Sequence, residues 1–371
     1  MKKFLVLLLA ASLLALFAAC GDNAPEGPAA DTETPDQEIA STYELAMITD
    51  GNDIELSDNF IRESWSGLKK YADENDISYT CYVPLDVSDQ AYADAVAKAV
   101  NNGAKLVILP SGLFEVAAYE VQYKYPDVSF VILDGEPRTS DYKDYTIEKN
   151  VNAIYFAEQE LGFLAGYAAV KEGFTQLGFI GGMALDPVVR FGYGYIAGAK
   201  YAAAENDVSG LEIKYTYSGG FAASEEVQKL ASGWYNSGTN VIFACGGAIT
   251  ESVSAAAETA GAYVIGVDTD ESGLSSTIIT SAKKEVAGAV YGSIEDYYNG
   301  EFHGGVIDTL TAANGGVSLE MANSRFTKFT SENYDAILAK LTSGSISLPD
   351  KDAVSSAAAL GDGRVKVTLV N

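Results

Sequence analysis

Polar and glycine residues follow several short apolar runs of the sequence, and these positions could contact a small molecule. Asp50-Gly51, Asp134-Gly135, Gly246-Gly247 and Asp268 each come directly after such a run. In open α/β sheets, ligands bind beyond the carboxyl ends of the strands. Short connections between strands and helices need Gly and Asp for their own geometry as well, so part of this pattern is structural.

The residues needed for covalent or metal chemistry are scarce. His303 is the only histidine, which excludes a Ser/His/Asp triad with a choice of base and a transition-metal cluster. It stands beside Gly304-Gly305 as a turn residue would, and Asp50 with Asp53 makes too small an acidic set for a calcium-dependent hydrolase. No Gly-rich phosphate motif follows any run. We therefore expect no enzyme activity, no metal and no cofactor.

Strand-like and helical stretches alternate from Tyr43 onward, which predicts βαβ units and parallel sheets covered by helices on both faces. Ile61, Trp65, Leu68 and Ala72 are spaced as one face of a helix. The expected strands are Leu45–Ile48, Ile77–Val83, Leu106–Leu109, Val128–Leu133, Leu177–Ile180, Ile213–Tyr217, Val241–Ala244 and Val264–Val267. Two of these runs contain Cys81 and Cys245, for which burial as small apolar residues is expected.

A body of this length is too large for one ordinary core, so two lobes are expected. The stretch from Lys149 to Tyr167 has the pattern of a crossover between them, and two further crossings are expected around Thr277–Ser281 and Val306–Leu319. We predict a first lobe from residues 43–150 plus 278–300 and a second from residues 151–277 plus 301–371. Such lobes close by a hinge motion around a ligand in the cleft between them.

The N-terminus reads MKKFLVLLLAASLLALFAAC. A basic start, an apolar stretch and two small residues before Cys20 have the layout of a secretory signal. We interpret residues 1–19 as a lipoprotein signal peptide, Cys20 as the diacylated new N-terminus and residues 20–42 as a disordered acidic tether. The alternative is an ordinary signal peptide that contains a cysteine near its end.

The chain is strongly acidic, with 51 Asp and Glu against 24 Lys and Arg and a net charge of −27. This charge repels nucleic acid and anionic lipid surfaces. It identifies no partner, because an acidic surface is common among exported proteins.

Seven segments of the chain have recognisable motifs. In chain order they are AMITDGNDIELSDNFIRESWSGL, KYPDVSFVILDG, FAEQELGFLAGYAA, GFIGGMALDPVVRFGYGYIAGAK, VIFACGGA, YVIGVDTDES and IITSAKKEV. Together they resemble the basic membrane protein family of solute-binding lipoproteins of ABC importers. The resemblance covers nearly the whole body and implies a type I periplasmic-binding fold of two doubly wound parallel-sheet lobes joined by hinge strands. It also implies an extracytoplasmic receptor, lipid-anchored to the bacterial cell membrane and monomeric, that delivers a purine nucleoside to permease and ATPase subunits.

The resemblance also implies which residues bind the ligand. In this family, two aromatic rings sandwich the base, and charged groups hold the ribose. Matched to this sequence, Phe60 and Phe221 are the rings, and Asp268 and Lys284 hold the sugar. The full predicted set is Asp50, Phe60, Glu115, Phe221, Gly246, Gly247, Asp268 and Lys284. The segment around Arg190 is expected at the lobe surface, in a structural or hinge role.

Two departures from the family pattern concern the base-reading positions. Ile61 stands where Asn usually follows the first ring, and Glu115 or Val116 stands nearest to an expected Asp. Recognition of one particular base depends on such hydrogen bonds. The alternatives to a nucleoside receptor of an importer are a ligand-sensing lipoprotein of the same fold and a receptor for another small solute such as a sugar.

Overall fold

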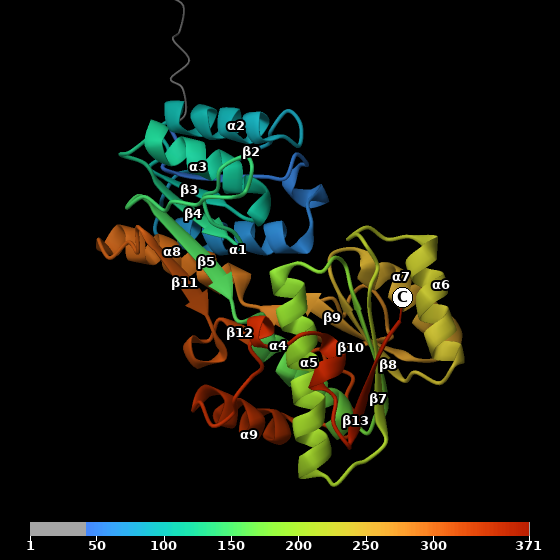
Figure 1. Cartoon of the computed structure of the whole chain (residues 1–371). Helices are drawn as coiled ribbons and strands as arrows, with labels where there is room; N and C mark the ends of the chain where they lie inside the picture. The colour runs from blue at the N-terminus through green and yellow to red at the C-terminus, as the bar shows by residue number, and fades with distance from the viewer. Residues whose placement is uncertain (1–41, 371) are drawn as a thin grey trace, which may run out of the picture. The chain divides into compact units, whose positions relative to one another are not determined.

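The computed structural model describes residues 42–370, which form two lobes on two separate sheets (Figure 1). Cys20 and the predicted signal peptide lie outside the described residues, as does the predicted tether up to residue 41. In spatial order, the first sheet consists of β11 (Val306–Leu310), β5 (Val151–Phe156), β4 (Ser129–Leu133), β3 (Leu106–Leu109), β1 (Leu45–Ile48) and β2 (Tyr79–Tyr82). The second consists of β12 (Val317–Leu319), β10 (Ile278–Lys284), β9 (Tyr263–Asp268), β8 (Val241–Cys245), β6 (Gln176–Gly181), β7 (Leu211–Tyr217) and β13 (Val365–Leu369).

Helices cover both sheets, and β10 with β12 is the only antiparallel pair of neighbouring strands among the described residues. The first lobe has α1 (Asn59–Glu74), α2 (Asp89–Asn101), α3 (Glu115–Lys124) and α8 (Val286–Asn299). The second has α4 (Glu158–Glu172), α5 (Asp186–Glu205), α6 (Glu225–Asn236), α7 (Ile249–Ala260) and α9 (Ser331–Thr342). The predicted fold class is therefore confirmed. Within residues 42–370, no helix combines the length and the apolar character needed to cross a bilayer.

The chain crosses between the lobes three times: from β5 into α4, from β10 into α8 and from β11 to β12. The predicted lobe boundaries are corrected at each crossing. Residues 151–156 and 306–310, expected in the second lobe, are strands of the first sheet, and residues 278–284, expected in the first lobe, are a strand of the second sheet. The reason is that the chain changes lobe after a strand has ended, so each crossing strand stays paired in the sheet that it leaves.

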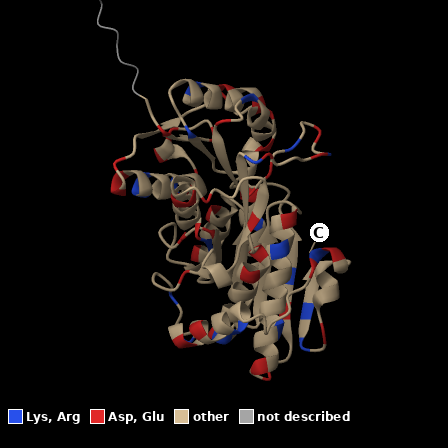
Figure 2. Cartoon of the chain, turned by 90° about the vertical axis from the view of Figure 1, so that its left-hand side faces the viewer, with Lys and Arg blue, Asp and Glu red and all other residues tan. Residues whose placement is uncertain are grey.

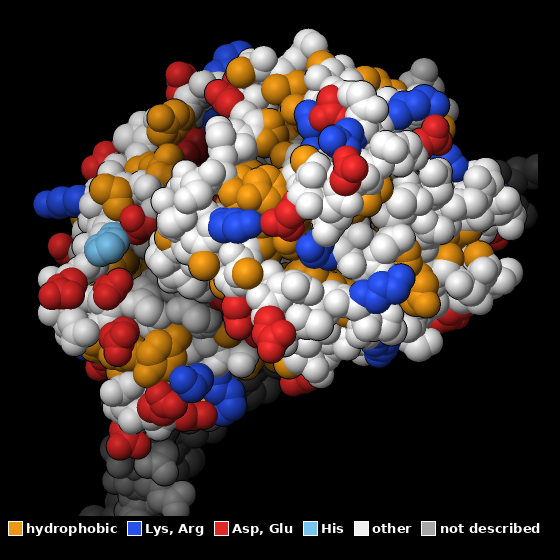
Figure 3. Space-filling view, turned by 90° about the horizontal axis from the view of Figure 1, so that it is seen from below, with side chains coloured by type: hydrophobic (Ala, Val, Ile, Leu, Met, Phe, Trp, Pro, Cys, Tyr) orange, Lys and Arg blue, Asp and Glu red, His pale blue; other side chains and the backbone are white. Residues whose placement is uncertain are grey.

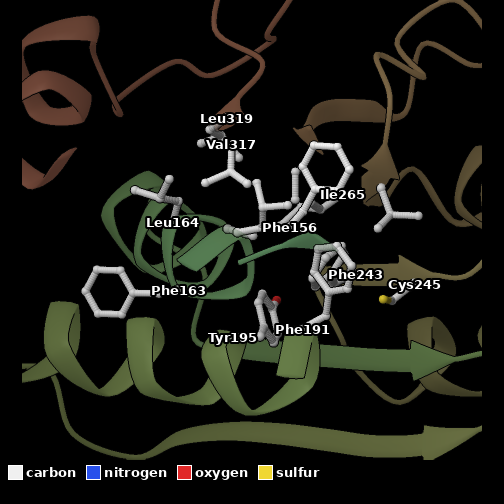
Figure 4. Close-up of a cluster of buried hydrophobic side chains, with 14 of the residues drawn as sticks. Phe156, Phe163, Leu164, Phe191, Tyr195, Phe243, Cys245, Ile265, Val317 and Leu319 are labelled. Atoms are coloured by element: carbon white, nitrogen blue, oxygen red, sulfur yellow. The ribbon is translucent and has the colours of Figure 1, made fainter. Parts of the chain in front are cut away.

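The two lobes share part of one apolar core. Phe156 at the end of β5 lies in the same cluster as Phe191 of α5 and Phe243 of β8 (Figure 4). Helices α4 and α5 approach so closely that a Cβ on Gly166 would lie 2.0 Å from the carbonyl oxygen of Tyr195. A side chain at that position would force the two helices apart. This packing fixes the start of both helices beneath the region between the lobes.

Candidate ligand-binding site

Two cavities lie between the lobes at the carboxyl ends of the sheet strands. The Phe60 cavity has a volume of about 350 Å³. It is lined by Leu56, Ser57, Asp58, Asn59, Phe60 and Arg62 of the first lobe and by Gly247, Ala248, Glu251, Val267, Asp268, Thr269, Glu271 and Leu274 of the second. The Arg138 cavity has a volume of about 790 Å³. It is lined by Gly112, Glu115, Asp134, Arg138, Tyr155, Phe156, Gln159, Leu185, Asp186, Pro187, Arg190, Ile307 and Thr309. Both volumes are within the range of small-molecule sites.

Phe60 is positioned by the start of α1. The Asp58 side chain caps this helix, because its Oδ1 accepts a hydrogen bond of 3.0 Å from the Ile61 amide. Ile61 is buried in the core, whereas the neighbouring Phe60 lines the cavity. The Phe60 ring meets Phe156 edge to face, with 6.3 Å between centroids. This contact supports one edge of the Phe60 ring.

Phe221 lies in the second lobe beside the loop that follows β8. Its carbonyl accepts a hydrogen bond of 2.9 Å from the Ala248 amide. Gly246 has a φ of 145° and Gly247 a φ of 53°, and a Cβ on Gly246 would lie 2.8 Å from the Phe221 ring. Only glycine combines these backbone angles with so close an approach to the ring. The Phe221 ring therefore lies against the glycine loop that lines the Phe60 cavity, without being part of the lining itself.

Lys284 connects the two lobes at the cavities. Its Nζ lies 2.6 Å from Asp134 Oδ2 of the first lobe, 3.3 Å from Asp268 Oδ1 and 3.3 Å from Glu158 Oε1. The Lys284 side chain is only 3% exposed and that of Glu158 is 0% exposed. Arg190 completes the cluster, with its Nε donating to Glu158 Oε2 at 2.8 Å. Three carboxylates thus face two cations, and the cluster keeps one net negative charge.

The electrostatics of this cluster favour a charged lysine. Burial opposes the ammonium form, but the three carboxylates outweigh it and raise the pKa of Lys284 well above its usual value. Burial also raises the pKa of Asp134, although the Lys284 ammonium acts in the opposite direction. Asp134 Oδ1 is buried and has no hydrogen-bond partner within residues 42–370. A ligand hydroxyl or amino group could donate to this oxygen only after the groups that cover it move apart.

Acidic and basic side chains also alternate around the Arg138 cavity. Glu115 Oε1 accepts a hydrogen bond of 3.2 Å from the Glu136 amide and lies 3.7 Å from Arg138 Nε. The Arg138 guanidinium also pairs with the Glu136 carboxylate and lies over the Tyr145 ring. Burial raises the pKa of the Glu115 carboxyl, although the hydrogen bond from the Glu136 amide and the charge of Arg138 oppose this effect. Glu115 and Glu136 are therefore both already engaged with Arg138.

The sequence of this chain matches a family model described as "ABC transporter substrate-binding protein PnrA-like" over residues 45–352. The chain belongs to this Bmp family. It is 30% identical to a protein of Lactococcus lactis named "ABC transporter nucleoside-binding protein BmpA", over 95% of this chain and 100% of that protein. It is 32% identical to "Basic membrane protein B" of Borreliella burgdorferi, over 75% and 81% of the two chains. The suspected family relationship is confirmed.

A solved structure supports the fold. An ABC transporter solute-binding protein from Conexibacter woesei superposes with a TM-score of 0.67 at 20% identity, over 84% of this chain and 99% of that one.

Proteins of the Bmp family are substrate-binding proteins of ABC transporters. The chain is therefore a substrate-binding protein that takes a small-molecule ligand and works with a transporter.

The structure brings most of the predicted site residues together. Phe60, Gly247 and Asp268 line the Phe60 cavity, and Glu115 lines the Arg138 cavity. Lys284 lies at the shared cluster, and Phe221 and Gly246 lie directly behind Gly247. Asp50 lines neither cavity. Its Oδ1 accepts hydrogen bonds from the Ser57 hydroxyl and the Asn52 amide, so it organises the loop before α1.

Three residues outside the predicted set also belong to this region. Asp134 and Glu158 contact Lys284, and Arg190 lines the Arg138 cavity instead of lying at the lobe surface. The Asp134-Gly135 turn after an apolar run was a visible signal in the sequence. For Glu158 and Arg190 no local signal existed, because their roles depend on a contact between α4 and α5.

The remaining reactive residues take no part in these cavities. Cys81 and Cys245 are free thiols, of which Cys245 is buried and Cys81 is half-buried. His303 lies at the surface among acidic side chains (Figure 3), where its Nδ1 is 3.0 Å from Asp308 Oδ2. Within the described part of the chain, no group of three or more His, Cys, Asp or Glu could hold a metal ion.

Proposed function

We propose that this protein is the extracytoplasmic receptor of an ABC importer and captures a nucleoside, foremost a purine nucleoside, between its lobes. The observation that carries this proposal is the composition of the Phe60 cavity. An aromatic ring of the first lobe and a glycine loop and carboxylate of the second line the same space. Closure of the two lobes would therefore enclose a flat ligand that also carries hydroxyl groups.

The aromatic rings would bind the base. Phe60 lines the cavity, and Phe221 lies behind the glycine loop on the opposite lobe. A base that moves the Gly246-Gly247 loop apart from Phe221 gains a second ring face. Stacking of a base on an aromatic ring contributes about 1–3 kcal/mol, by analogy with proteins that bind single-stranded nucleic acid. Two rings would supply most of the affinity without selecting one particular base.

The charged cluster would bind the ribose. Asp268 lines the Phe60 cavity, Asp134 lines the Arg138 cavity, and Lys284 lies between their carboxylates. A carboxylate forms short, charge-assisted hydrogen bonds with hydroxyl donors. Vicinal hydroxyls of a ribose offer two such donors, while Lys284 holds the carboxylates in position. This arrangement favours a nucleoside over a free base.

A thermal-shift panel of nucleosides, free bases, sugars and short peptides tests the ligand. A ligand that binds only the native state raises stability by RT ln(1 + [L]/Kd). We expect purine nucleosides to raise Tm most, with a dissociation constant in the micromolar range or below. A shift with sugars and none with nucleosides would contradict the ligand assignment. Analysis of the same incubations by chromatography tests the proposal that the ligand is not converted.

The membrane anchor rests on the sequence alone. We propose that Cys20 is diacylated and holds the protein on the outer face of the cytoplasmic membrane as a monomer. Metabolic labelling with a fatty acid should label the wild-type protein and leave Cys20→Ala unlabelled and released from the membrane fraction. Equal labelling of both proteins would contradict the proposal. Light scattering of the purified body tests the monomeric state.

A further inference from the structure

A further cavity lies where the chain crosses between the lobes. It has a volume of about 400 Å³ and is lined by residues of β5, α8 and β11 and of the connections that follow α8 and β11. Glu285, at the crossing from β10 to α8, and Gly315-Gly316, at the crossing from β11 to β12, are part of its lining. Among the described residues, Thr309 alone also lines the Arg138 cavity, and none also lines the Phe60 cavity. We call this space the hinge cavity.

The charged side chains of the hinge cavity are nearly all acidic. Glu285, Asp296 and Asp308 line it, and no Lys or Arg of residues 42–370 does. The basic group of the lining is His303, whose Nδ1 is 3.0 Å from Asp308 Oδ2. Lys283, which pairs with Glu285 at 3.4 Å, lies outside the lining. Even with a protonated histidine, three carboxylates face two cations, so the cavity attracts cations and repels anions.

A buried amide adds an acceptor to these carboxylates. Asn152 is only 3% exposed and lines the hinge cavity. Its Nδ2 donates a hydrogen bond of 2.8 Å to Asp308 Oδ2, whereas its Oδ1 accepts none from any group within residues 42–370. The Phe302 ring lines the same space. An ammonium group can donate to an amide oxygen and a carboxylate together, and an aromatic ring beside it adds a cation–π contact.

Two glycines of α8 keep the hinge cavity open. Gly288 and Gly292 line it and are four residues apart, so they lie on one face of the helix. A Cβ on Gly292 would meet no atom within 4 Å, and a Cβ on Gly288 would meet only the Glu285 Cβ at 4.0 Å. By contrast, Gly67 of α1 is required for packing on α8, because its Cβ would lie 2.2 Å from the Ala287 carbonyl oxygen. Glycine destabilises a helix by about 1 kcal/mol relative to alanine, and packing does not require it at the two cavity positions.

We propose that the hinge cavity is a second ligand site, which binds a small organic cation with at least one protonated amino group. The ammonium group would donate to Asp296, Asp308 and the Asn152 amide oxygen. The carbon chain of the ligand would lie along the glycine face of α8 and against Phe302. This site is separate from the cavities proposed to bind the nucleoside.

The lining favours this class of ligand over three others. An anion would meet three carboxylates, and an uncharged solute would gain nothing from their charge. A metal ion lacks a ligand set, because no group of three or more His, Cys, Asp or Glu in the described part of the chain could hold one. An organic ammonium uses the carboxylates, the amide oxygen and the ring together.

The position of the hinge cavity links the second site to lobe closure. The Glu285 amide donates a hydrogen bond of 2.9 Å to the Gly316 carbonyl, so two of the three crossings are joined at the cavity wall. A bound cation would contact these crossings and the first lobe at once. Hinge motion changes the crossings, so the cation should bind the open and closed states differently and thereby alter nucleoside affinity. This consequence rests on the proposed function, whereas the site itself does not.

The experiment titrates the purified chain with 1,4-diaminobutane by calorimetry at physiological ionic strength. 1,4-Butanediol and succinate are the uncharged and anionic probes of the same chain length. The charge variant is Asp296→Asn with Asp308→Asn. The space variant is Gly288→Leu with Gly292→Leu, which fills the cavity from a helix face where leucine is well tolerated.

Each variant has a matched control. Asp127→Asn with Asp335→Asn removes the same two negative charges from exposed positions before β4 and on α9. Gly233→Leu changes an exposed glycine of α6, where a Cβ also meets no atom within 4 Å. These controls separate the hinge cavity from general attraction of amines to an acidic protein and from the effect of a helix substitution.

The wild type and both controls should bind one diaminobutane per chain and bind butanediol and succinate at least about tenfold more weakly. The charge variant and the space variant should each lose about tenfold or more in diaminobutane affinity, while thermal unfolding shows that both are folded. The proposal fails if both variants bind diaminobutane like their controls, or if butanediol binds the wild type as tightly. Binding that depends only on net charge would appear as equal losses in the charge variant and its control, and would also overturn it.

A second titration, with adenosine, tests the link to closure. Saturating diaminobutane should change the adenosine dissociation constant of the wild type by about fivefold or more and leave that of the space variant unchanged. An unchanged constant in the wild type would contradict the link. Because diaminobutane binding is measured without nucleoside, absence of adenosine binding would count against the proposed function and not against the second site.

Discussion

The Phe60 cavity and the Arg138 cavity lie on either side of Lys284 but are built from different interactions. The first is made of a capped helix start, a glycine loop and a strand-end carboxylate, all within short connections. The second depends on ion pairs between elements that are distant in the sequence, such as Arg190 with Glu158 and Arg138 with Glu115. The Phe60 cavity thus offers an aromatic ring and backbone groups, whereas the charged side chains beside the Arg138 cavity are largely paired with each other.

The charged residues are also arranged differently between the lobes and on the outer surface. Acidic and basic residues lie close together between the lobes, and the remaining acidic residues are spread over the surface of both lobes (Figure 2). The carboxylates around Lys284 connect the two cavities, because Asp268 lines the Phe60 cavity and Asp134 lines the Arg138 cavity.

The largest effect is expected for Lys284→Met. The change leaves Asp134, Glu158 and Asp268 together without their shared cation, and loss of one partner from a buried ion pair costs about 3–5 kcal/mol. Chemical denaturation measures the free energy of unfolding. Lys283→Met is the matched control, because Lys283 is more exposed and pairs with Glu285 and Glu320 at 3.4 Å. If both variants lost the same free energy of unfolding, the buried cluster would stabilise the fold no more than the exposed pairs of Lys283.

Loss of either ring should have the next largest effect. Phe60→Ala and Phe221→Ala should each weaken nucleoside binding by about 10- to 100-fold, corresponding to the 1–3 kcal/mol of a stacked base. Calorimetric titration measures the dissociation constant. Phe326→Ala, which removes a ring that contacts Phe329 away from both cavities, should leave it unchanged. Unchanged affinity in both ring variants would contradict base stacking in this cleft.

Glu115→Gln should have a smaller effect that appears as altered selectivity. Glu115 lines the Arg138 cavity, so the change should shift the affinity ratio between nucleosides with and without an amino group by about fivefold, roughly 1 kcal/mol. The control is Glu136→Gln, because Glu136 pairs with the same arginine but does not line the cavity. If both variants keep the wild-type ratio, the Arg138 cavity plays no part in reading the base.

The smallest effect is expected for Glu271→Gln at low pH. Burial raises the pKa of Glu271 from 4.5 to about 8, although hydrogen bonds from the Val267 amide and the Thr250 hydroxyl oppose it. A raised pKa in the folded state stabilises the protein at low pH, and this contribution is lost as the pH rises from about 4.5 through about 8. Near pH 4, where the wild-type carboxyl is also largely protonated, the uncharged variant should differ from the wild type by less than about 1 kcal/mol.

The pH profile distinguishes this explanation from a simple packing change. The unfolding free energy of Glu271→Gln should decline less between pH 5 and pH 8 than that of the wild type, since the amide does not ionise. Glu251→Gln is the control, because Glu251 is exposed and lines the Phe60 cavity, as Glu271 does. A parallel decline in wild type and Glu271→Gln would show that Glu271 does not titrate in this range.

Local patterns in the sequence predict the elements and the turns at the strand ends, whereas the roles of Phe60 and Phe221 come from the family resemblance. The spacing of Ile61, Leu68 and Ala72 predicts the buried face of α1, and Gly246-Gly247 after the run Val241–Ala244 predicts a turn at the end of a strand. The residues of each pattern lie within a few positions of each other in the sequence. Such patterns can be recognised from the sequence because turn geometry and helix periodicity are local properties.

The sequence does not predict the lobe boundaries or the second half of the cleft. Nothing local indicates that Val306–Leu310 pairs with β5 in the first sheet, or that Arg190 reaches Glu158 across two helices. Such contacts depend on how the sheets and helices pack together. For Asp50 the reason is different: the family resemblance implied a contact with the ligand, whereas its carboxylate accepts a local hydrogen bond from Ser57.

The interleaving of the two sheets has a consequence for the order of folding. The first sheet is complete only when β11 is available, after β6 to β10 of the second have already been made. The second sheet in turn gains its last strand, β13, only at residues 365–369. Neither lobe can finish as an independent unit during synthesis, and pairing of such distant strands is slow. The chain thus stays incompletely folded until nearly all of it has been made, which matches a protein that has to pass through a membrane before it folds.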